Sequence, residues 1–577
     1  MPAATSWVAF FIEIWTRMES FFERNFFMET AKIINSLLVI PETLNECIKK
    51  ATDFVLFQYD QDNHPSYSEL EKEILREESA LIVLRNAQYQ DKHIKIPNRL
   101  CASQIGDILL TTTYIKRIRM VVVEDSSLFD KLGIYDEDKG IYVTDIVSFE
   151  HHIRALDYTI TDKGIKEVMS YLYTNAPVVL RTMKPNLTAV NNGVFDTERK
   201  ILLPFSPDMY FLTKCATNYD PYAYNVVIHN NDDGTDWDVE SWVASLSDDP
   251  EVVQLLWEIM SALVRPFVSW DKSAWFYSET GCNGKGTLCS LMRNLCGDGA
   301  CDSITIAQFS DRFALGSLIN KLCIINDEND VGTFVDKTGK LKALITHDVV
   351  TVENKYEKSV NFSFYGFIIQ CLNEFPRFKD KTESFYRRQL FIPFTKCFTG
   401  KERKYIKDDY LKRPEVLEYV LYKVLNMDFN KLSEPAACRN ILDDYKEYND
   451  TIRQFLNEML DELVWDFVPF SFLYDLYKAW SAKNNPTGLV MGKNTFVHDL
   501  MTKLDYYPDW YCDNPKKAQR PGHLMDKKEF LIAEYNLRDW QDPTYVGYDI
   551  NKICSPNLKQ HYTGIFRSGT IGSNDEG

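Results

Sequence analysis

The sequence predicts an α/β core built on a mostly parallel sheet, preceded by a mixed α+β domain and followed by a small helical or winged-helix domain. Three observations support this fold class. Strand-like apolar runs alternate with helical stretches from about residue 250 to 430, which is typical of a parallel sheet covered by helices. Short β-rich runs such as "IRMVVVED" precede this region, and helical, aromatic segments follow it. A glycine-rich segment, "SETGCNGKGTLCSLM", joins one strand to the next helix.

Composition limits the classes of protein that this chain can be. The chain has 577 residues, 45% of them hydrophobic, and a formal net charge of -18. This length suits about three to four domains, and the acidic balance argues against a protein coated in basic surface, so any nucleic-acid contact must be local. Thirteen cysteines show neither CxxC pairs nor zinc-like Cys/His spacing, which predicts reduced thiols in a cytoplasm.

Shifts in composition divide the chain into segments. They are a helical region of unknown role (1–100), a mixed α+β domain (101–245), the α/β core (246–430), a helical or winged-helix-like domain (431–535) and a weakly structured tail (536–577). The polar "HNNDDGTDWD" (229–238) predicts a linker, and "DPEVVQLLWEIMSALV" predicts a helix that starts at Asp249 or Pro250.

The N-terminal apolar run "SWVAFFIEIWTRMESFF" is short and is interrupted by Glu13. It fits neither a membrane-spanning helix nor a signal peptide. We expect an amphipathic packing or partner helix, or a non-native extension upstream of Met28, and no membrane contact.

The turn "YDEDKG" lies between two β-rich runs and predicts a hairpin in the mixed domain. Asp136 and Asp138 could instead form the metal-binding DxD of a primase or polymerase. Acidic residues in a turn are more often solvated, so we interpret them as part of the hairpin.

The glycine-rich segment has the context of a phosphate-binding loop. Ser273 to Tyr277 predict a buried strand, and "TLCSLMRNL" continues with helical spacing. Backbone N–H groups at the start of such a helix can hold phosphate oxygens while a lysine reaches the β and γ groups. The predicted phosphate-loop residues are Gly281, Asn283, Gly284, Lys285, Gly286 and Thr287.

This loop departs from the pattern GxxxxGK[ST]. Glu279 occupies the position of the first glycine, and Gly286 stands where Ser or Thr normally binds magnesium. Thr287, one residue later, is therefore the candidate for the magnesium-binding hydroxyl or for shaping the loop.

Polar residues follow three later strand-like runs. "LCIINDEND" ends in Asp327, a candidate magnesium ligand, and Glu328, a candidate activator of water. "FIIQCLNEF" ends in Asn373, an amide suited to bind water or the γ-phosphate. Arg387 and Arg388 precede "LFIPF". Together with the loop, these residues predict nucleotide hydrolysis.

In this order, the motifs resemble those of superfamily 3 helicases. "GCNGKGT", "LCIINDE", "LKALITHDVVTVENKYEKSVNF", "IIQCLNEFPRF" and "FYRRQLFIPF" are similar to the P-loop, acidic, B-prime, sensor and arginine motifs. The similarity is to the branch that contains the poxvirus primase-helicase and replication proteins of phages, plasmids and mobile elements. It covers roughly residues 105 to 530, and residues 1 to about 100 do not match the primase domain of larger members.

The resemblance implies an AAA+ ATPase that forms a ring, expected to be a hexamer, and moves along single-stranded or forked DNA using ATP and Mg²⁺. Lys285 and Thr287 would bind ATP and magnesium, with Asp327 and Glu328 as the acidic motif and Asn373 as the sensor. Arg387 or Arg388 would reach the nucleotide of the neighbouring subunit, and Arg388 is slightly favoured because it is nearer to the strand. A separately encoded primase or polymerase is a further expected partner.

Two lysine-containing segments are candidate DNA contacts. Lys342, Lys355 and Lys358 lie in or near "VENKYEKS", which we interpret as a hairpin projecting into the pore, where ring symmetry multiplies a few cations. The alternative is a solvated surface hairpin. Lys516, Lys517 and Arg520 are interpreted as the basic wing of a winged helix. A helical cap on the ATPase is the alternative there.

Two other functions remain open. "GKGT" also occurs in small-molecule kinases, although a kinase would not explain Asn373 or the arginine pair. An ATP-switched initiator or scaffold that binds DNA without processive unwinding is the second alternative, because Glu279 beside the phosphates could weaken nucleotide binding.

Overall fold

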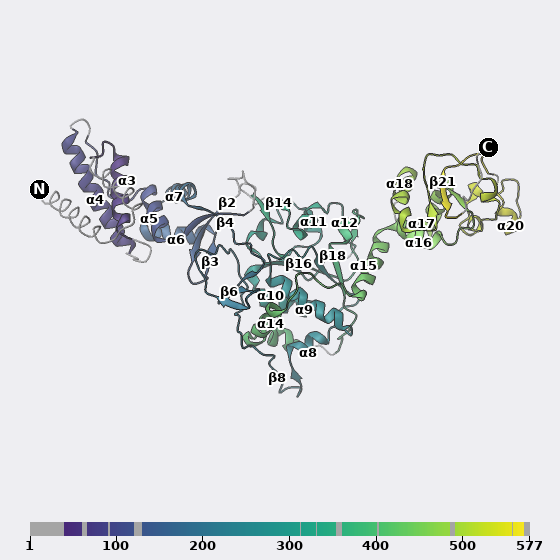
Figure 1. The fold of residues 1–577 in the computed structure, drawn as a ribbon, viewed down its shortest axis with the longest axis horizontal. Coiled ribbons are helices and arrows are strands. Elements are labelled where there is room, and N and C mark those ends of the chain that lie inside the picture. Colours follow the sequence, from purple (N-terminus) through teal and green to yellow (C-terminus); the bar gives the residue numbers. More distant parts are fainter. Residues whose placement is uncertain are drawn as a thin grey trace. The chain divides into compact units, whose positions relative to one another are not determined.

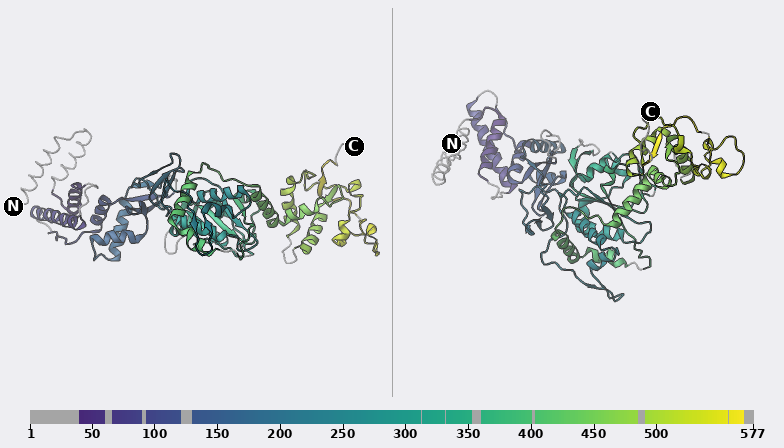
Figure 2. Two further views of the ribbon diagram at one scale, coloured as in Figure 1. Left: turned by 90° about the horizontal axis from the view of Figure 1, so that it is seen from below. Right: turned by 45° about the vertical axis from the view of Figure 1, so that its right-hand side comes forward.

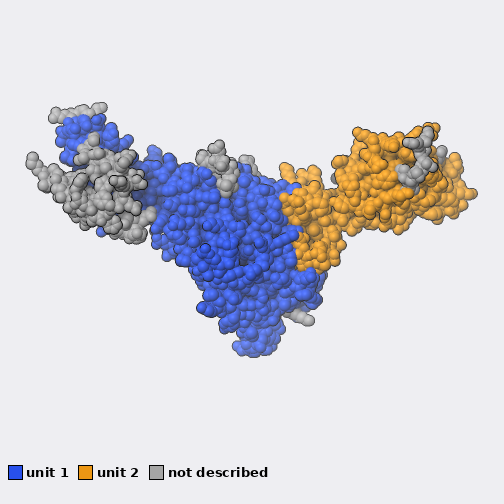
Figure 3. Space-filling view, in the orientation of Figure 1, with its two compact units in different colours: residues 1–329, 339–371, 394–433 blue, residues 330–338, 372–393, 434–577 orange. Residues whose placement is uncertain are grey.

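The computed structural model describes residues 40–569 except 60–65, 90–92, 121–129, 312, 331, 353–359, 401–402, 485–490 and 557. The N-terminal apolar run that was expected to form an amphipathic helix lies outside these residues. The chain forms two compact units (Figure 3): residues 1–329, 339–371 and 394–433 make the first, and residues 330–338, 372–393 and 434–577 make the second.

The first unit begins with two packed helices, α3 (Leu44–Phe57) and α4 (Tyr67–Gln88). Each helix starts at a capping box, in which Thr43 pairs with Glu46 and Ser66 pairs with Glu69. These reciprocal bonds satisfy backbone donors that a helix N-terminus leaves without intrahelical partners.

A mixed α+β domain follows, as expected. Its four-stranded sheet has the order β3-β2-β1-β4. The elements are α5 (Ala102–Thr112), β1 (Ile115–Arg119), β2 (Asp130–Asp136), β3 (Ile141–Val143), α6 (Ile146–Leu156), α7 (Asp162–Asn175) and β4 (Val178–Leu180). β2 and β3 form the expected antiparallel hairpin, and its turn contains Gly140 at φ +70°. Asp136 pairs with Lys139 at 2.8 Å within this turn.

Two antiparallel pieces lead into the core. The first is a meander of β5 (Leu187–Val190), β6 (Gly193–Asp196) and β7 (Ile201–Leu203). The second is a hairpin of β8 (Ile228–His229) and β9 (Asp236–Trp237), followed by α8 (Val239–Ala244). The segment 229–238 that was expected to be a linker is therefore mostly this hairpin, closed by Gly234 at φ +66°.

The core is a five-stranded parallel sheet with the order β11-β12-β16-β10-β18. Its strands are β10 (Ser273–Tyr277), β11 (Cys301–Asp302), β12 (Cys323–Asn326), β16 (Phe367–Leu372) and β18 (Gln389–Pro393). The helices α9 (Pro250–Val264), α10 (Lys285–Cys296) and α14 (Pro414–Asn426) pack against one another beside this sheet (Figure 1). A further view shows teal strands of the core among teal and green helices (Figure 2, left).

Helix α9 begins where the sequence predicted. Asp249 is its N-cap, its carboxylate accepts a hydrogen bond from the Glu251 N–H at 2.9 Å, and Pro250 is the first helical residue. Proline fits this position because the first turn needs no donor from it. Most of the helix from Val252 onward is buried, which places it inside the core.

Shorter elements surround the core. They are β13 (Phe334–Val335), α11 (Gly339–Ile345), β14 (Val349–Val352), β15 (Val360–Ser363), β17 (Arg377–Phe378), α12 (Glu383–Tyr386) and α13 (Lys404–Asp408). β14 and β15 pair antiparallel, so the B-prime segment is a hairpin, as expected, although its tip lies outside the described residues.

The C-terminal part of the second unit combines helices with a three-stranded antiparallel sheet of order β19-β21-β20. Its elements are α15 (Ala436–Asn449), α16 (Thr451–Met459), β19 (Phe467–Pro469), α17 (Phe470–Asn484), α18 (Lys493–Lys503), β20 (Trp510–Tyr511), α19 (Leu531–Glu534), α20 (Ile550–Ile553) and β21 (Gly564–Arg567).

The segment 536–577 was expected to be a weakly structured tail, and this expectation was wrong for the part that the structure describes. It supplies β21, the central strand of the sheet, and it buries Trp540, Cys554 and Ile565 in the aromatic core of the unit. The strand was not recognised in this loop-like sequence, because β21 is only four residues long and the strands that it pairs with lie about 50 and 100 residues earlier.

Among the described residues, no helix combines the length and the apolar character needed to cross a bilayer.

Two isoleucines of the C-terminal segment test its packing. Ile565→Ala should lower the stability of the unit by about 2–4 kcal/mol, because Ile565 is fully buried and its removal leaves a cavity. Ile550→Ala is the matched control, since Ile550 is 53% exposed, and it should change stability by less than about 0.5 kcal/mol. Thermal unfolding measures both, and two equally small effects would contradict the packing of β21.

Candidate nucleotide-binding site

The chain reverses sharply between β10 and α10. Gly284, the N-cap of α10, has φ +86°, and a Cβ built on it would lie 2.7 Å from Cδ2 of Leu246. Cys282 also has a positive φ of 54°. This reversal leaves the first N–H groups of α10 without intrahelical acceptors, and their position at the positive end of the helix dipole suits an anion.

Side chains of the loop hold this conformation. The buried Asn283 accepts a hydrogen bond from the Lys285 N–H at 3.3 Å and donates to the carbonyl of Thr280. Lys285 is only 6% exposed, and its Nζ donates to the Ser278 carbonyl at 3.4 Å. Burial lowers the pKa of Lys285, because desolvation disfavours the ammonium form. A phosphate bound at this loop would place negative charge beside Lys285 and so favour its ammonium form.

Glu279 does not occupy the loop interior. Its side chain is exposed and accepts a hydrogen bond from the Tyr277 hydroxyl at 3.1 Å. The position that is glycine in the usual pattern therefore carries a carboxylate that is held by the preceding strand.

The order of the strands places this loop at a crevice of the sheet. After β10 the chain crosses to β11 at the far edge, returns through β12 and β16, and adds β18 on the other side of β10. The order therefore reverses next to β10. Ligands of open α/β sheets bind at such a switch point, outside the carboxyl ends of the strands.

Asp327 and Glu328 follow β12 at the same edge. The Asp327 carboxylate forms an ion pair with Arg293 of α10 at 2.8 Å, and Arg293 also donates to the Ile325 carbonyl. Glu328 is exposed, and its backbone carbonyl accepts a hydrogen bond from the buried Asn326 at 2.6 Å. Arg293 thus connects the helix of the phosphate loop to the acidic strand end.

A cavity of about 510 Å³ opens beside the phosphate loop, within the range of small-molecule sites. From the loop it is lined by Cys282, Gly284 and Thr287. Its other walls carry three aromatic rings, which are Trp237, Trp242 and Phe398. They also carry three cations, which are Arg403, Lys404 and Lys407, and two carboxylates, which are Asp236 and Asp238.

Two of these aromatic residues have features that suit a ligand. Within the described chain, the buried indole N–H of Trp237 has no hydrogen-bond partner, so it can donate to a group in the cavity. Phe398 is fixed against the phosphate loop, because its N–H donates to the Cys282 carbonyl at 2.8 Å. Flat apolar faces beside an anion-binding loop are suited to a base and its phosphates.

Sequence reasoning missed the cavity walls and Arg293. Trp237 and Trp242 lie in and after the segment interpreted as a linker, and Phe398 and Arg403 lie in loops 114 and 119 residues after Gly284. The one feature of the sequence that indicated a folded wall here is the pair of tryptophans after Gly234, because a solvent-exposed linker seldom contains large aromatic residues.

The predicted sensor and arginine residues belong to the second unit. Asn373 is exposed and follows β16 directly. Arg387 is exposed, whereas Arg388 is half-buried and donates to the hydroxyl of Ser384 at 2.8 Å and to its carbonyl. The intrachain bonds of Arg388 leave Arg387 as the better placed of the two to extend from the surface.

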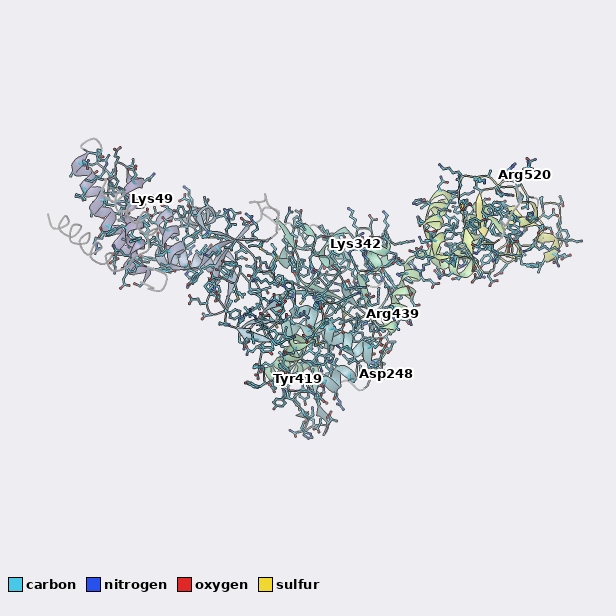
Figure 4. The ribbon with its side chains drawn as sticks, viewed as in Figure 1. Lys49, Asp248, Lys342, Tyr419, Arg439 and Arg520 are labelled. Carbon is cyan, nitrogen blue, oxygen red and sulfur yellow. The ribbon has the colours of Figure 1, made fainter. Side chains whose placement is uncertain are left out.

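The candidate DNA contacts lie in separate places. Lys342 is a half-buried residue of α11, and Lys355 and Lys358 lie outside the described residues. Lys516, Lys517 and Arg520 are all exposed in the loop after β20. Figure 4 labels Lys342 on the first unit and Arg520 on the second.

Comparison with protein families gives three matches along the chain. Residues 149–261 match "D5 N terminal like", residues 276–388 match "Family of unknown function (DUF5906)", and residues 447–536 match "Poxvirus D5 protein-like". Comparison with curated proteins finds no match.

Comparison with solved structures gives further matches at low identity. An apo structure of the NrS-1 C-terminal region has 14% sequence identity and a TM-score of 0.42, covering 78% of this chain and 93% of that one. A JCV helicase structure has 15% identity and a TM-score of 0.22, covering 41% and 62%.

A parallel sheet with a phosphate loop at its switch point and an acidic strand end defines the class of P-loop ATPases. Within that class, the matches on both sides of the loop show that the chain carries D5-type domains, which is the domain arrangement expected of a superfamily 3 helicase. The enzyme is therefore an ATPase of the helicase type.

Two glycines of the loop make a matched test of its geometry. Gly284→Ala should destabilise the nucleotide-free protein by about 1–3 kcal/mol, because a left-handed residue with a Cβ is strained and this Cβ also collides with Leu246. Gly286→Ala meets no atom within 4 Å and lies inside α10, so it should stabilise by up to about 1 kcal/mol. Thermal unfolding of both variants checks the expectation, and effects of the same sign would contradict the loop conformation.

Proposed function

We propose that this chain is an ATP-dependent, ring-forming replicative DNA helicase of a phage or mobile genetic element, active in the cytoplasm of its host cell. The observation that carries the proposal is the junction of the phosphate loop with the 510 Å³ cavity, which is lined by aromatic and charged side chains. This arrangement suits a nucleoside triphosphate, with the base against the rings and the phosphates at the start of α10.

The residues present fit the magnesium that ATP carries. Mg²⁺ prefers oxygen ligands and binds through one or two protein groups together with substrate phosphates. Thr287 lines the cavity with a hydroxyl, and the Asp327 side chain is 38% exposed, so its carboxylate is accessible. Gly281, Asn283, Gly284, Lys285 and Gly286 would hold the phosphates through the loop backbone and the Lys285 ammonium.

Hydrolysis needs a base for the attacking water. Glu328 is exposed at the end of the acidic strand, and a carboxylate there can take the proton of water as the γ-phosphate leaves. Asn373 follows the neighbouring strand and offers an amide to orient that water. Arg293 would keep the backbone at Ile325 and the Asp327 carboxylate in place during this step.

In a ring, the neighbouring subunit would supply the positive charge that stabilises the phosphoryl group during hydrolysis. In superfamily 3 helicases an arginine of one subunit stabilises the phosphoryl group held by the next, and this makes hydrolysis depend on assembly. We assign this role to Arg387 in preference to Arg388, because Arg388 is bonded to Ser384 of its own chain. The hexameric state follows the family and is part of the proposal.

The C-terminal part of the second unit suits a winged helix that contacts DNA. The elements follow in the order α16, β19, α17, α18, β20 and β21, and β21 is central in the sheet. In this arrangement α18 would be the second helix of a helix–turn–helix pair, and residues 512–563 would form an enlarged wing. Lys516, Lys517 and Arg520 lie exposed on this wing and would contact phosphates. Lys342, Lys355 and Lys358 would contact single-stranded DNA near the B-prime hairpin, and a separate primase or polymerase would complete the replication machinery.

The scaffold alternative loses its main support. It depended on Glu279 crowding the phosphates, and Glu279 is exposed and bonded to Tyr277. The kinase alternative does not explain the D5-like matches.

Mixed rings test the shared active site. Glu328→Gln and Arg387→Ala should each lower DNA-stimulated ATP turnover by about 10²–10⁴-fold, because each removes a group needed in the transition state. Mixing the two variants should restore part of the turnover, since some interfaces then combine an intact Glu328 with an intact Arg387. Steady-state ATP hydrolysis with and without single-stranded DNA measures this.

Arg388→Ala is the control for that experiment, and it should lose less turnover than Arg387→Ala. A mixture that recovers no activity would contradict the ring, and a larger loss in Arg388→Ala would exchange the roles of the two arginines.

The wing is tested by salt dependence. The triple variant Lys516→Ala, Lys517→Ala, Arg520→Ala should bind DNA more weakly and reduce the slope of log affinity against log salt by about 2–3, because each phosphate contact contributes about 0.7–0.9. A control triple with the same change of charge replaces Lys337, Lys379 and Arg439, which are exposed on the same unit outside residues 512–563. Equal slopes for the two triples would contradict a wing that binds phosphates.

A further inference from the structure

Three cysteine thiols converge beneath the end of α10. Cys296 is the last residue of α10, Cys301 begins β11 and Cys323 begins β12. The three sulfur atoms lie within 4.8 Å of one another, and all three side chains are buried. Cys323 donates a thiol hydrogen bond to the Cys301 sulfur at 3.3 Å.

The fold brings these residues together by register. Cys301 and Cys323 are directly opposed in the parallel pairing of β11 with β12, so their side chains share one face of the sheet. Helix α10 covers that face and contributes Cys296. This convergence of three cysteines was not predicted from the sequence, because the spacings of 5 and 22 residues match no metal-binding motif.

The three sulfur atoms are close enough for small side-chain movements to bring them around a single ion. Metal–thiolate bonds of zinc are about 2.3 Å long, so two thiolates on one ion lie at most about 4.6 Å apart. Buried cysteines often act only as small apolar residues. Packing alone, however, does not require three sulfur atoms from three separate elements to meet at one point.

The chemistry of the donors selects the ion. In the described part of the chain, these cysteines are the one group of three or more His, Cys, Asp or Glu side chains whose ligand atoms lie close enough to share a metal ion. All of these ligand atoms are sulfur. Soft thiolates favour Cu⁺ and Zn²⁺ over hard cations such as Mg²⁺. Arg293 interacts electrostatically with Cys301 and Cys323, and its positive charge offsets part of the negative charge of a thiolate cluster.

We propose that Cys296, Cys301 and Cys323 bind one thiophilic ion, Zn²⁺ or Cu⁺, through their three sulfur atoms. Binding exchanges the thiol protons for metal–sulfur bonds and releases those protons to solvent. The ion would join the end of the phosphate-loop helix to β11 and to β12, the strand that leads to Asp327. The site is separate from the nucleotide cavity and does not depend on the proposed helicase function.

The first measurement is metal content. The full chain, purified under reducing and oxygen-free conditions, is titrated separately with Zn²⁺ and with Cu⁺ against a competing chelator, and bound metal is measured by mass spectrometry of the elements. We expect roughly one ion per chain, with a higher thermal midpoint in the metal-bound protein, because binding to the native state stabilises it.

A matched pair of variants locates the ion. Cys296→Ala should lose the bound ion. Cys289→Ala should keep it, because Cys289 lies two turns earlier on α10 and contacts Cys371 at 3.5 Å, outside the cluster. Both replacements remove a fully buried thiol from the same helix, so their costs in packing are comparable.

A further readout needs no variant. The bound ion should protect Cys296, Cys301 and Cys323 of the native protein from slow alkylation, relative to Cys289, when the modified cysteines are identified by peptide mass spectrometry. A wild-type chain that binds neither ion above background would overturn the proposal, as would equal loss of metal in Cys289→Ala.

Discussion

The left-handed turn at Gly284 is the constraint on which the nucleotide site depends. It lets the chain leave a fully buried strand and enter a helix within seven residues, and it directs the N-terminus of that helix toward the edge of the sheet. Leu246 packs where a side chain on Gly284 would be, so the space for the turn is set by the segment before the core. Leu246 therefore both packs against the phosphate loop and lines the neighbouring cavity.

Contacts between elements then connect the loop to the rest of the site. Arg293 joins α10 to the end of β12 through Asp327 and the Ile325 carbonyl. Phe398 joins the cavity wall to the loop through the Cys282 carbonyl. Each of these bonds links parts of the chain that are far apart in sequence.

The sequence was sufficient for features that are local or that repeat a known order. The start of α9 at Asp249 and Pro250, the buried strand before the loop and the β2–β3 hairpin follow from capping, apolar runs and turn residues. The acidic residues after β12 and the asparagine after β16 followed from the expected parallel sheet.

Features formed by distant pairing were not accessible in the same way. β21 was missed because a four-residue strand in polar surroundings has no periodicity of its own. The cavity walls at Trp237, Trp242 and Phe398 come from a hairpin, a short helix and a loop, and only the fold brings them to the phosphate loop. The ion pair of Arg293 with Asp327 likewise depends on packing of α10 against the sheet. In each case the relevant distance is set by tertiary structure and not by spacing along the chain.

The most direct test of this account is the equilibrium binding of magnesium–ATP to the nucleotide-free chain and to Lys285→Met, measured by calorimetry. Methionine retains an unbranched apolar side chain in a buried position but removes the ammonium group. The account predicts that the wild-type chain binds ATP and that the variant binds about 10- to 100-fold more weakly, the expected cost of losing a hydrogen bond to a charged group. Equal affinities for the two proteins would contradict the assignment of this loop as the phosphate site.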